Sequence, residues 1–194
     1  MDEPLTTLEE TTPRTEAARF GGESRAGNFV ADAVRAATGA DVGLFPAGSI
    51  RTGPPLEGEV TVGDIVGVIP FDDELRELSV TGRALRDVLA DAAVPHAQER
   101  GWVHLHLSGV HARWTDDHTL ETVTIDGDPL QLTDQYSVGT MGYLVSTEDF
   151  EPLSEETVVR KHKSAIDALL DHARRGGFAD AERTGRIRKQ SEED

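Results

Sequence analysis

The order in which helical and strand-like segments follow one another constrains the fold of this chain most. Apolar residues recur at helical spacing over 26–38, and again after Thr81 and after Ser164. Short apolar or alternating runs typical of strands lie between these segments, without the regular alternation of a doubly wound fold. A stretch rich in hairpins begins near residue 103. This order predicts an α/β (α+β) domain, a layered fold with a mixed β-sheet and flanking helices.

Capping residues predict where several of these helices begin and end. Gly39 suits the C-terminus of the first helix, whereas Thr61 and Ser164 each precede an acidic residue by three positions, as in a capping box. The predicted helices cover 26–38, a short turn after Thr61, a segment after Thr81, and 165–175. The predicted strands cover 42–45, 66–71, 74–80, 103–107, 110–114, 120–125 and 136–145. The strands 103–107 and 110–114 flank Ser108-Gly109, as in a hairpin.

The length of 194 residues is that of one domain. Residues 1–17 are polar and aperiodic, which indicates a flexible lead-in or linker. The domain itself is expected to cover 18–188, and residues 189–194 are expected to be a disordered tail.

The charge of the chain excludes several kinds of partner. With 36 Asp and Glu against 19 Lys and Arg, the formal net charge is −17, so neither nucleic acid nor an anionic membrane is an expected partner. Only three of the basic residues are Lys, and an acidic chain with so little Lys is typical of a high-salt cytoplasm. The short Debye length there screens the excess charge. The composition therefore indicates a halophilic source.

Other classes are excluded by what the sequence lacks. Without cysteine, the chain has no disulfide, thiolate zinc site or cysteine nucleophile. The first 20 residues contain several acidic side chains and no apolar run, so they are not a signal peptide as they stand. The expected location is the cytoplasm, or outside it if the sequence is a fragment of an exported protein.

Two patterns suggest catalysis only weakly. His104 and His106 would face the same side of a strand, which suits a metal ion, but two ligands do not complete a metal site. The alternative is a pair of ordinary surface histidines. Ser49 follows a strand as a nucleophile would, yet its surroundings lack the second glycine of the G-x-S-x-G motif, which argues against an esterase.

Arg51, Phe71 and Tyr143 suggest binding rather than catalysis. Arg51 follows a glycine-containing loop at the end of a strand, where its guanidinium suits a phosphate or a carboxylate. Pairing with a surface acid is the alternative. Phe71 and Tyr143 stand beside polar residues, and two such aromatic side chains can hold a flat base by stacking. Packing within the core is the alternative for each of them.

Several motifs, taken together and in order, resemble the C-terminal domain of the 5′-nucleotidase family. The matching segments are 22–33 (GESRAGNFVADA), 48–51 (GSIR), 58–64 (GEVTVGD), 68–71 (VIPF), 107–110 (LSGV), 123–130 (VTIDGDPL), 143–149 (YLVSTED) and 185–187 (GRI). The resemblance covers about residues 18 to 188, and several motifs in register are far more specific than any one alone.

The resemblance implies a nucleotide-binding domain with a defined set of ligand contacts. In this family two aromatic side chains hold the base, an aspartate holds the ribose and arginines hold phosphate. By position, Phe71 and Tyr143 correspond to the clamp, Asp149 to the ribose contact and Arg51 to a phosphate contact. The further implied contacts are a second phosphate arginine at Arg19, an approach of backbone to base at Gly109, and a base contact at Asp73.

The sequence also departs from the family pattern. The loop 46–49 reads Pro-Ala-Gly-Ser where the family has an Asn and three glycines, and residues 147–150 lack the family's glycines around Asp149. The two-metal chemistry of the family belongs to a separate metallophosphatase domain, whose Gly-Asn-His motif is not found in these residues. No cofactor is therefore expected in this chain, and alone it is expected not to hydrolyse nucleotides.

Two functions remain open from the sequence. The first is the nucleotide- or nucleoside-binding domain of a 5′-nucleotidase, acting in nucleotide catabolism with a metallophosphatase domain in the same chain or in a partner. The second is a standalone, non-catalytic binding or interaction module descended from that domain. An independent metal hydrolase that uses His104 and His106 is a remote third.

Overall fold

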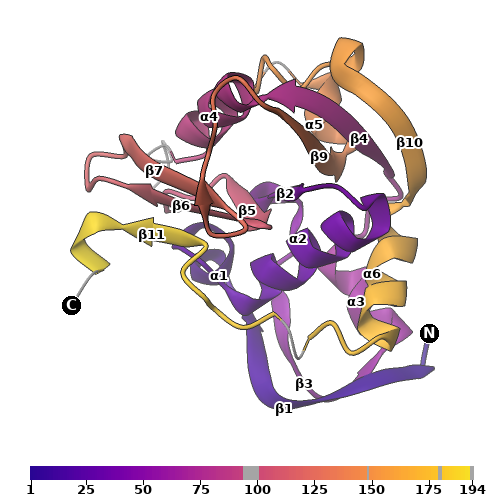
Figure 1. The fold of residues 1–194 in the computed structure, drawn as a ribbon. Coiled ribbons are helices and arrows are strands. Elements are labelled where there is room, and N and C mark those ends of the chain that lie inside the picture. The colour runs from indigo at the N-terminus through magenta and orange to yellow at the C-terminus, as the bar shows by residue number, and fades with distance from the viewer. Residues whose placement is uncertain (94–100, 148, 179–180, 193–194) are drawn as a thin grey trace.

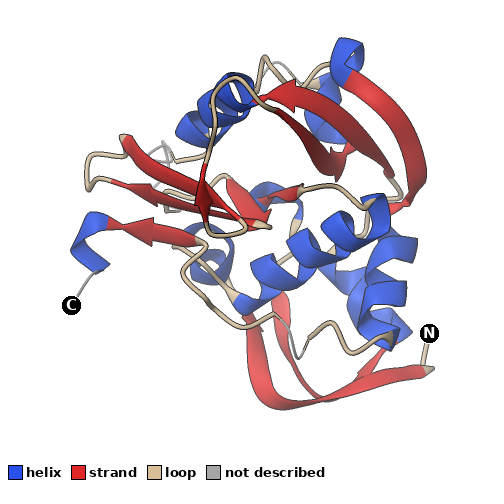
Figure 2. Cartoon of the chain, in the orientation of Figure 1, coloured by secondary structure: helices blue, strands red, loops and turns tan. Residues whose placement is uncertain are grey.

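The computed structural model describes residues 1–93, 101–147, 149–178 and 181–192. Three sheets and the helices packed against them form the molecule, as Figures 1 and 2 show. The strands are β1 (Pro4–Arg14), β2 (Val42–Pro46), β3 (Gly53–Thr61), β4 (Glu74–Thr81), β5 (Leu105–Ser108), β6 (Val110–Trp114), β7 (Leu120–Ile125), β8 (Asp128–Pro129), β9 (Gln135–Met141), β10 (Val158–Ser164) and β11 (Ile187–Lys189). The helices are α1 (Glu16–Phe20), α2 (Arg25–Thr38), α3 (Val62–Val68), α4 (Gly82–Asp91), α5 (Gly142–Ser146) and α6 (Ala165–Arg174), with 3-10 turns at Ala47–Ser49, Glu155–Thr157 and Gln190–Glu192.

The central sheet has five strands in the order β10-β4-β9-β2-β5. Strand β9 runs antiparallel to β4 and parallel to β2, so the sheet is mixed, and the predicted α/β class with a mixed sheet and flanking helices is confirmed. The other sheets are the ribbon β1-β3 and the four-stranded order β11-β6-β7-β8.

The central sheet separates two hydrophobic cores. Because successive side chains of a strand point to opposite faces, Leu44 of β2 enters one core and Phe45 enters the other. The helices α2, α3 and α6 and the β1-β3 ribbon cover the face of Phe45. Helix α4 and the four-stranded sheet cover the opposite face. Both faces of the central sheet are thus covered, so a binding site is expected at the ends of its strands.

The capping signals predicted from the sequence are confirmed. Gly39 ends α2 in the left-handed conformation, with φ of 70°, and its N–H bonds to Arg35 O. Thr61 and Asp64 form the reciprocal capping box of α3. Hydrogen bonds from the backbone N–H and the hydroxyl of Thr61 lower the pKa of the Asp64 carboxyl. Ser164 accepts a bond from the backbone of Asp167 and starts α6.

The predicted lead-in at residues 1–17 is wrong, because most of it is strand β1. This strand pairs antiparallel with β3, and Thr12 and Arg14 are buried where the ribbon meets α3. Arg14 donates through Nε to Pro54 O at 2.9 Å, and its burial lowers the pKa of the guanidinium. The segment looked aperiodic because register shifts break its alternation and most of its outward face is polar. The domain therefore begins near residue 4.

The predicted hairpin around Ser108-Gly109 is also wrong. Strand β5 pairs with β2 in the central sheet, whereas β6 pairs with β7 and β11 in another sheet. Gly109, with φ of 74°, carries the chain from one sheet to the other. A side chain there would begin 2.3 Å from Asp41 O, so the crossing requires glycine.

Two predicted strands and the predicted tail need correction as well. Residues 62–68 form α3, so the strand expected at 66–71 does not exist, and the strand expected at 136–145 ends at Met141, where α5 begins. The expected tail at 189–194 starts inside β11, which pairs parallel to β6 and is followed by the 3-10 turn Gln190–Glu192. Residues 193–194 lie outside the described residues. Within the described ranges, no helix is long and apolar enough to cross a membrane.

Candidate functional site

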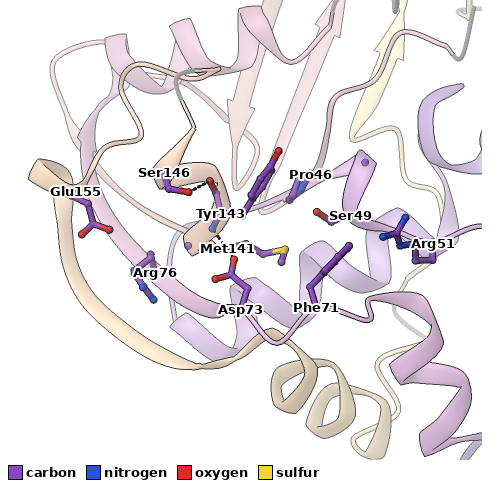
Figure 3. A pocket seen from close by; sticks show the side chains of 12 residues that line it. Pro46, Ser49, Arg51, Phe71, Asp73, Arg76, Met141, Tyr143, Ser146 and Glu155 are labelled. Atoms are coloured by element: carbon purple, nitrogen blue, oxygen red, sulfur yellow. Dashed lines mark hydrogen bonds between the residues drawn. The ribbon is translucent and has the colours of Figure 1, made fainter. Parts of the chain in front are cut away.

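A cavity of about 710 Å³ lies at one end of the central sheet, where β2, β4 and β9 run into loops and α5. Figure 3 shows the side chains that line it. They are Pro46, Gly48, Ser49, Arg51, Phe71, Asp73, Arg76, Met141, Gly142, Tyr143, Ser146 and Glu155. These residues come from segments far apart in the sequence, which is typical of a binding site at strand ends.

Two aromatic side chains stand open to solvent in this cavity. Phe71, in the loop between α3 and β4, is 40% exposed, and Tyr143, in the first turn of α5, is 53% exposed. Most other large apolar side chains of the described residues are buried. Apolar surface held in a concave site favours association with a ligand, because binding removes that surface from water. Core packing, the alternative reading of both residues, is therefore excluded.

Arg51 lies beside Phe71. Its guanidinium carbon is 4.8 Å from the centre of the Phe71 ring, which is a cation–π contact. Its backbone N–H bonds to Val68 O at 2.8 Å, so the loop after β2 is tied to the end of α3. Among the described residues, no carboxylate forms a salt bridge with Arg51. The charge of Arg51 therefore remains available at the cavity.

Asp73 ties the two sides of the cavity together. Its Oδ2 accepts a hydrogen bond of 2.7 Å from the backbone N–H of Tyr143, and its backbone oxygen accepts one of 2.8 Å from Ala165 at the start of α6. The loop that carries Phe71 is thus fixed to both α5 and α6. A side chain at Gly142 would begin 2.9 Å from Asp73 Oδ1, so glycine allows this close approach.

Arg19 lies behind the wall formed by the loop 46–49. Its Nη2 donates to Gly48 O at 2.8 Å, its Nε to Ala47 O at 3.4 Å, and its Nη1 to the Glu16 carboxylate at 2.9 Å. The side chain is buried, and two carbonyl groups of the wall accept hydrogen bonds from it. Arg19 therefore shapes the cavity from behind and does not line it.

Arg51, Phe71, Asp73 and Tyr143 are brought together by the fold, while the other residues predicted for the site lie elsewhere. Asp149 is exposed beyond α5, and Gly109 lies at the crossing between the two sheets. Neither of them, nor Arg19, lines the cavity. The ligand roles of all seven residues stay predictions.

Three charged or polar residues of the cavity were not predicted from the sequence. Arg76 of β4 is paired with Glu74 at 3.2 Å, and the centre of its guanidinium lies 3.3 Å from where a side chain at Gly142 would begin. Ser146 and Glu155 reach the cavity from α5 and the turn after it. The only available signal was the position of Arg76 in an alternating strand, which reads equally well as a solvent-facing side chain.

The expectation of a pair of surface histidines is wrong for His106, which lies in the core. His106 is fully buried, and its Nε2 lies 2.9 Å from Arg19 O, so the ring is not open to an ion from solvent. Burial lowers the pKa of His106 to about 4, which keeps the ring neutral. In the part of the chain that the structure describes, no group of three or more acidic or histidine side chains could hold a metal ion.

Comparisons with known proteins agree with the fold. Residues 4–153 match the model of the 5′-nucleotidase C-terminal domain family. The trifunctional nucleotide phosphoesterase YfkN of Bacillus subtilis is 27% identical over 135 residues, which are 63% of this chain and 9% of that protein. The chain thus spans only a small part of this relative.

Two solved structures share the fold. The 5′-nucleotidase precursor of Thermus thermophilus superposes with a TM-score of 0.82 and 20% identity, over 96% of this chain and 39% of that one. The NAD nucleotidase NadN of Haemophilus influenzae gives a TM-score of 0.74 and 17% identity, over 90% of this chain and 36% of that one. In both, the matching region is little more than a third of the longer chain.

Proposed function

Because this chain belongs to the 5′-nucleotidase C-terminal domain family, we propose that its cavity binds the base of a nucleotide or nucleoside between Phe71 and Tyr143. The observation that carries this proposal is the meeting around one cavity of two exposed aromatic side chains, a carboxylate and an arginine that has no salt bridge among the described residues. Aromatic rings hold a base by stacking on its face, and the arginine adds a positive charge for a ligand that carries phosphate.

Titration calorimetry with adenosine, AMP and UDP-glucose in molar KCl tests the proposal. We expect binding heat with at least one of them, and its loss in Phe71→Ala. Leu132→Ala is the matched control, because Leu132 is also an exposed apolar side chain, at 39%, but lies outside the cavity. Absence of heat with all three compounds would contradict the proposal. Equal weakening by both variants would place the binding elsewhere.

We further propose that hydrolysis requires a metallophosphatase domain, in the same chain or in a partner. The support is that this chain matches little more than a third of each nucleotidase structure. A nucleotidase assay with added Mn²⁺ or Zn²⁺ tests this second step. We expect no phosphate release by these residues alone, and release in proportion to protein concentration would contradict the proposal.

The acidic surface fits a protein adapted to high salt, and we propose this as the reason for its net charge of −17. Repulsion between carboxylates falls as the salt concentration rises, because the Debye length shortens from about 10 Å at 0.1 M to about 3 Å at 1 M. We expect the melting temperature to rise between 0.1 and 2 M KCl. A melting temperature that stays constant or falls would contradict the adaptation.

A further inference from the structure

The four-stranded sheet has an outer face that is open to solvent. Its inner face supplies Val110, Ala112 and Trp114 of β6 to the hydrophobic core. Because successive side chains of a strand point to opposite faces, His111 and Arg113 lie on the outer face. Figure 1 shows β11 beside β6 in this sheet. A hollow of about 360 Å³ lies where β6, β7 and β11 meet, and it shares no residue with the cavity at the end of the central sheet.

Basic and hydroxyl side chains line this hollow. Its polar lining consists of His111, Arg113, Thr122, Thr124, Thr184 and Arg188. None of the described residues that line it carries a carboxylate, although the chain has 36 acidic residues against 19 basic ones. The cavity at the end of the central sheet, in contrast, is lined by charges of both signs. The hollow therefore has a positive local charge on an acidic protein, and such a region attracts anions.

Strand pairing brings two arginines of the hollow together. Arg188 of β11 lies directly beside Arg113 of β6, which in turn lies opposite Thr122 of β7. Like charges at neighbouring positions of a sheet repel each other. The carboxylate of Glu121 pairs with Arg113, 3.1 Å from its Nε. No carboxylate within the described ranges forms a salt bridge with Arg188, so the charge of Arg188 is available to a ligand.

The segment that leads into β11 is fixed in position. Glu23 accepts the backbone N–H groups of residues 184–186, and the carbonyl oxygen of Arg186 accepts an N–H of β6 at 2.9 Å. Gly185 has a φ of 84°, and a Cβ there would overlap the guanidinium of Arg188. Glycine thus lets this guanidinium lie against the fixed segment. A side chain that already rests on fixed backbone loses less conformational freedom when it binds a ligand.

We propose that this hollow binds a small tetrahedral oxyanion such as inorganic phosphate, with Arg188 as its main contact. The planar guanidinium presents several N–H donors that match the oxygens of such an anion. The hydroxyls of Thr122 and Thr124 and the ring of His111 offer further hydrogen bonds. These groups come from three neighbouring strands, so they surround an anion from several sides, which suits a tetrahedral group. The inference does not depend on the nucleotide proposed for the other cavity.

Titration with inorganic phosphate, followed by ¹H–¹⁵N NMR at constant ionic strength, tests the proposal. We expect shifts that saturate at millimolar phosphate for the side-chain Nε–H of Arg188 and for the backbone amides of His111 and Thr124. Arg188→Gln keeps a polar side chain but removes the charge. It is expected to weaken phosphate binding by about tenfold, because hydrogen bonds between charged groups are the strong ones. Shifts that rise linearly with phosphate, without saturation, would overturn the proposal.

Two further variants locate the binding. Arg83→Gln removes an exposed arginine of α4 that lines neither hollow nor cavity, and it should leave phosphate binding unchanged. Equal weakening by Arg83→Gln and Arg188→Gln would show a general attraction to positive charge and would overturn the proposal. Arg51→Gln should leave the shifts around Arg188 in place, and their loss in this variant would assign the phosphate to the other cavity. Phosphate binding that persists when no nucleoside binds would support this site while the proposed function fails.

Discussion

Around Asp32, the polar groups are paired with other residues of the chain. Arg186 donates to this carboxylate through Nη1 at 2.6 Å and Nη2 at 3.0 Å, and the Ser108 hydroxyl donates to it as well. Nearby, Glu23 accepts the backbone N–H groups of Thr184, Gly185 and Arg186, at 2.8–3.1 Å. We call these residues, Glu23, Asp32, Ser108 and Arg186, the C-terminal clamp, because they fix the segment before β11 to α2.

Arg51 and the two aromatic rings of the cavity differ from this pattern. Arg51 has a ring as its neighbour instead of a carboxylate, and the aromatic rings are exposed instead of packed. A buried charge needs a partner, because leaving it alone in the interior is far more costly than leaving it in water. An exposed charge can remain unpaired at little cost. Asp32 and Arg186 therefore stabilise the fold, whereas Arg51 and the exposed rings are available to a ligand.

A substitution in the C-terminal clamp gives the largest expected change in stability. Asp32→Ala leaves the guanidinium of Arg186 buried and without its carboxylate, and removal of one member of a buried pair lowers stability by about 3–5 kcal/mol. The side chains of Arg186 and Asp32 are 11% and 15% exposed, which supports a value in this range. Urea unfolding measures the change, with Arg83→Ala as a control expected within about 0.5 kcal/mol of the original protein. A similarly small change in Asp32→Ala would break the comparison between the two regions.

The buried His106 is expected to make the free energy of unfolding depend on pH. Its pKa falls from 6.5 to about 4 on folding because the ring is fully buried, so the unfolded state binds more protons between these values. Above pH 6.5 His106 is neutral in both the folded and the unfolded state, so it does not change the free energy of unfolding. As the pH falls from 6.5 toward 4, the free energy of unfolding decreases, by about 3 kcal/mol in all. The measurement is urea unfolding at several pH values, in the original protein and in His106→Gln, which does not titrate. Parallel pH profiles for the two proteins would refute this assignment.

Tyr143 should separate binding from stability. Since its side chain is 53% exposed, Tyr143→Ala removes little buried surface and should change the unfolding free energy by less than about 0.5 kcal/mol. The same change should weaken nucleoside binding by about 1–3 kcal/mol through lost stacking. Calorimetry and urea unfolding on one preparation give both values. A large loss of stability would mean that the Tyr143 ring supports the fold. The difference between the cavity and the C-terminal clamp would then be smaller.

Gly142 gives the smallest effect of the four. A Cβ there would lie 2.9 Å from Asp73 Oδ1 and 3.1 Å from Glu74 O, so Gly142→Ala must displace the carboxylate that holds Tyr143. We expect a loss of about 1 kcal/mol in stability and weaker adenosine binding. Gly67→Ala in α3 is the control, because the nearest atom to its Cβ would be at an ordinary 3.6 Å. Equal stability and equal adenosine binding in Gly142→Ala and Gly67→Ala would show that displacement of the Asp73 carboxylate affects neither property.

Local signals in the sequence predicted local structure well. The caps at Gly39, Thr61 and Ser164 each depend on residues within a few positions, so the helices they delimit were predicted closely. Strand partners depend on tertiary packing instead, which is why β5 and β6 were taken for a hairpin although they belong to different sheets. Periodicity alone could not distinguish these arrangements.

The residues of the cavity show the same limit. Arg51, Phe71, Asp73 and Tyr143 were found through motifs, because each stands in a short segment of recognisable sequence. Arg76 was not found, since it enters the cavity only through the twist and pairing of β4. The contact between Asp73 and Tyr143 spans 70 positions and could not be read from either segment alone.

The position of the C-terminal clamp has a consequence for synthesis on the ribosome. Glu23 and Asp32 appear early in the chain, but the backbone and guanidinium donors that bind them lie at residues 184–186, far along the chain. Until those residues have emerged, the two carboxylates lack these donors and β6 lacks its neighbour β11. Contacts between distant parts of a chain form late and slowly. The nascent domain therefore completes its fold only after residue 186 has been made, and a chain truncated before residue 184 would leave both carboxylates without these partners.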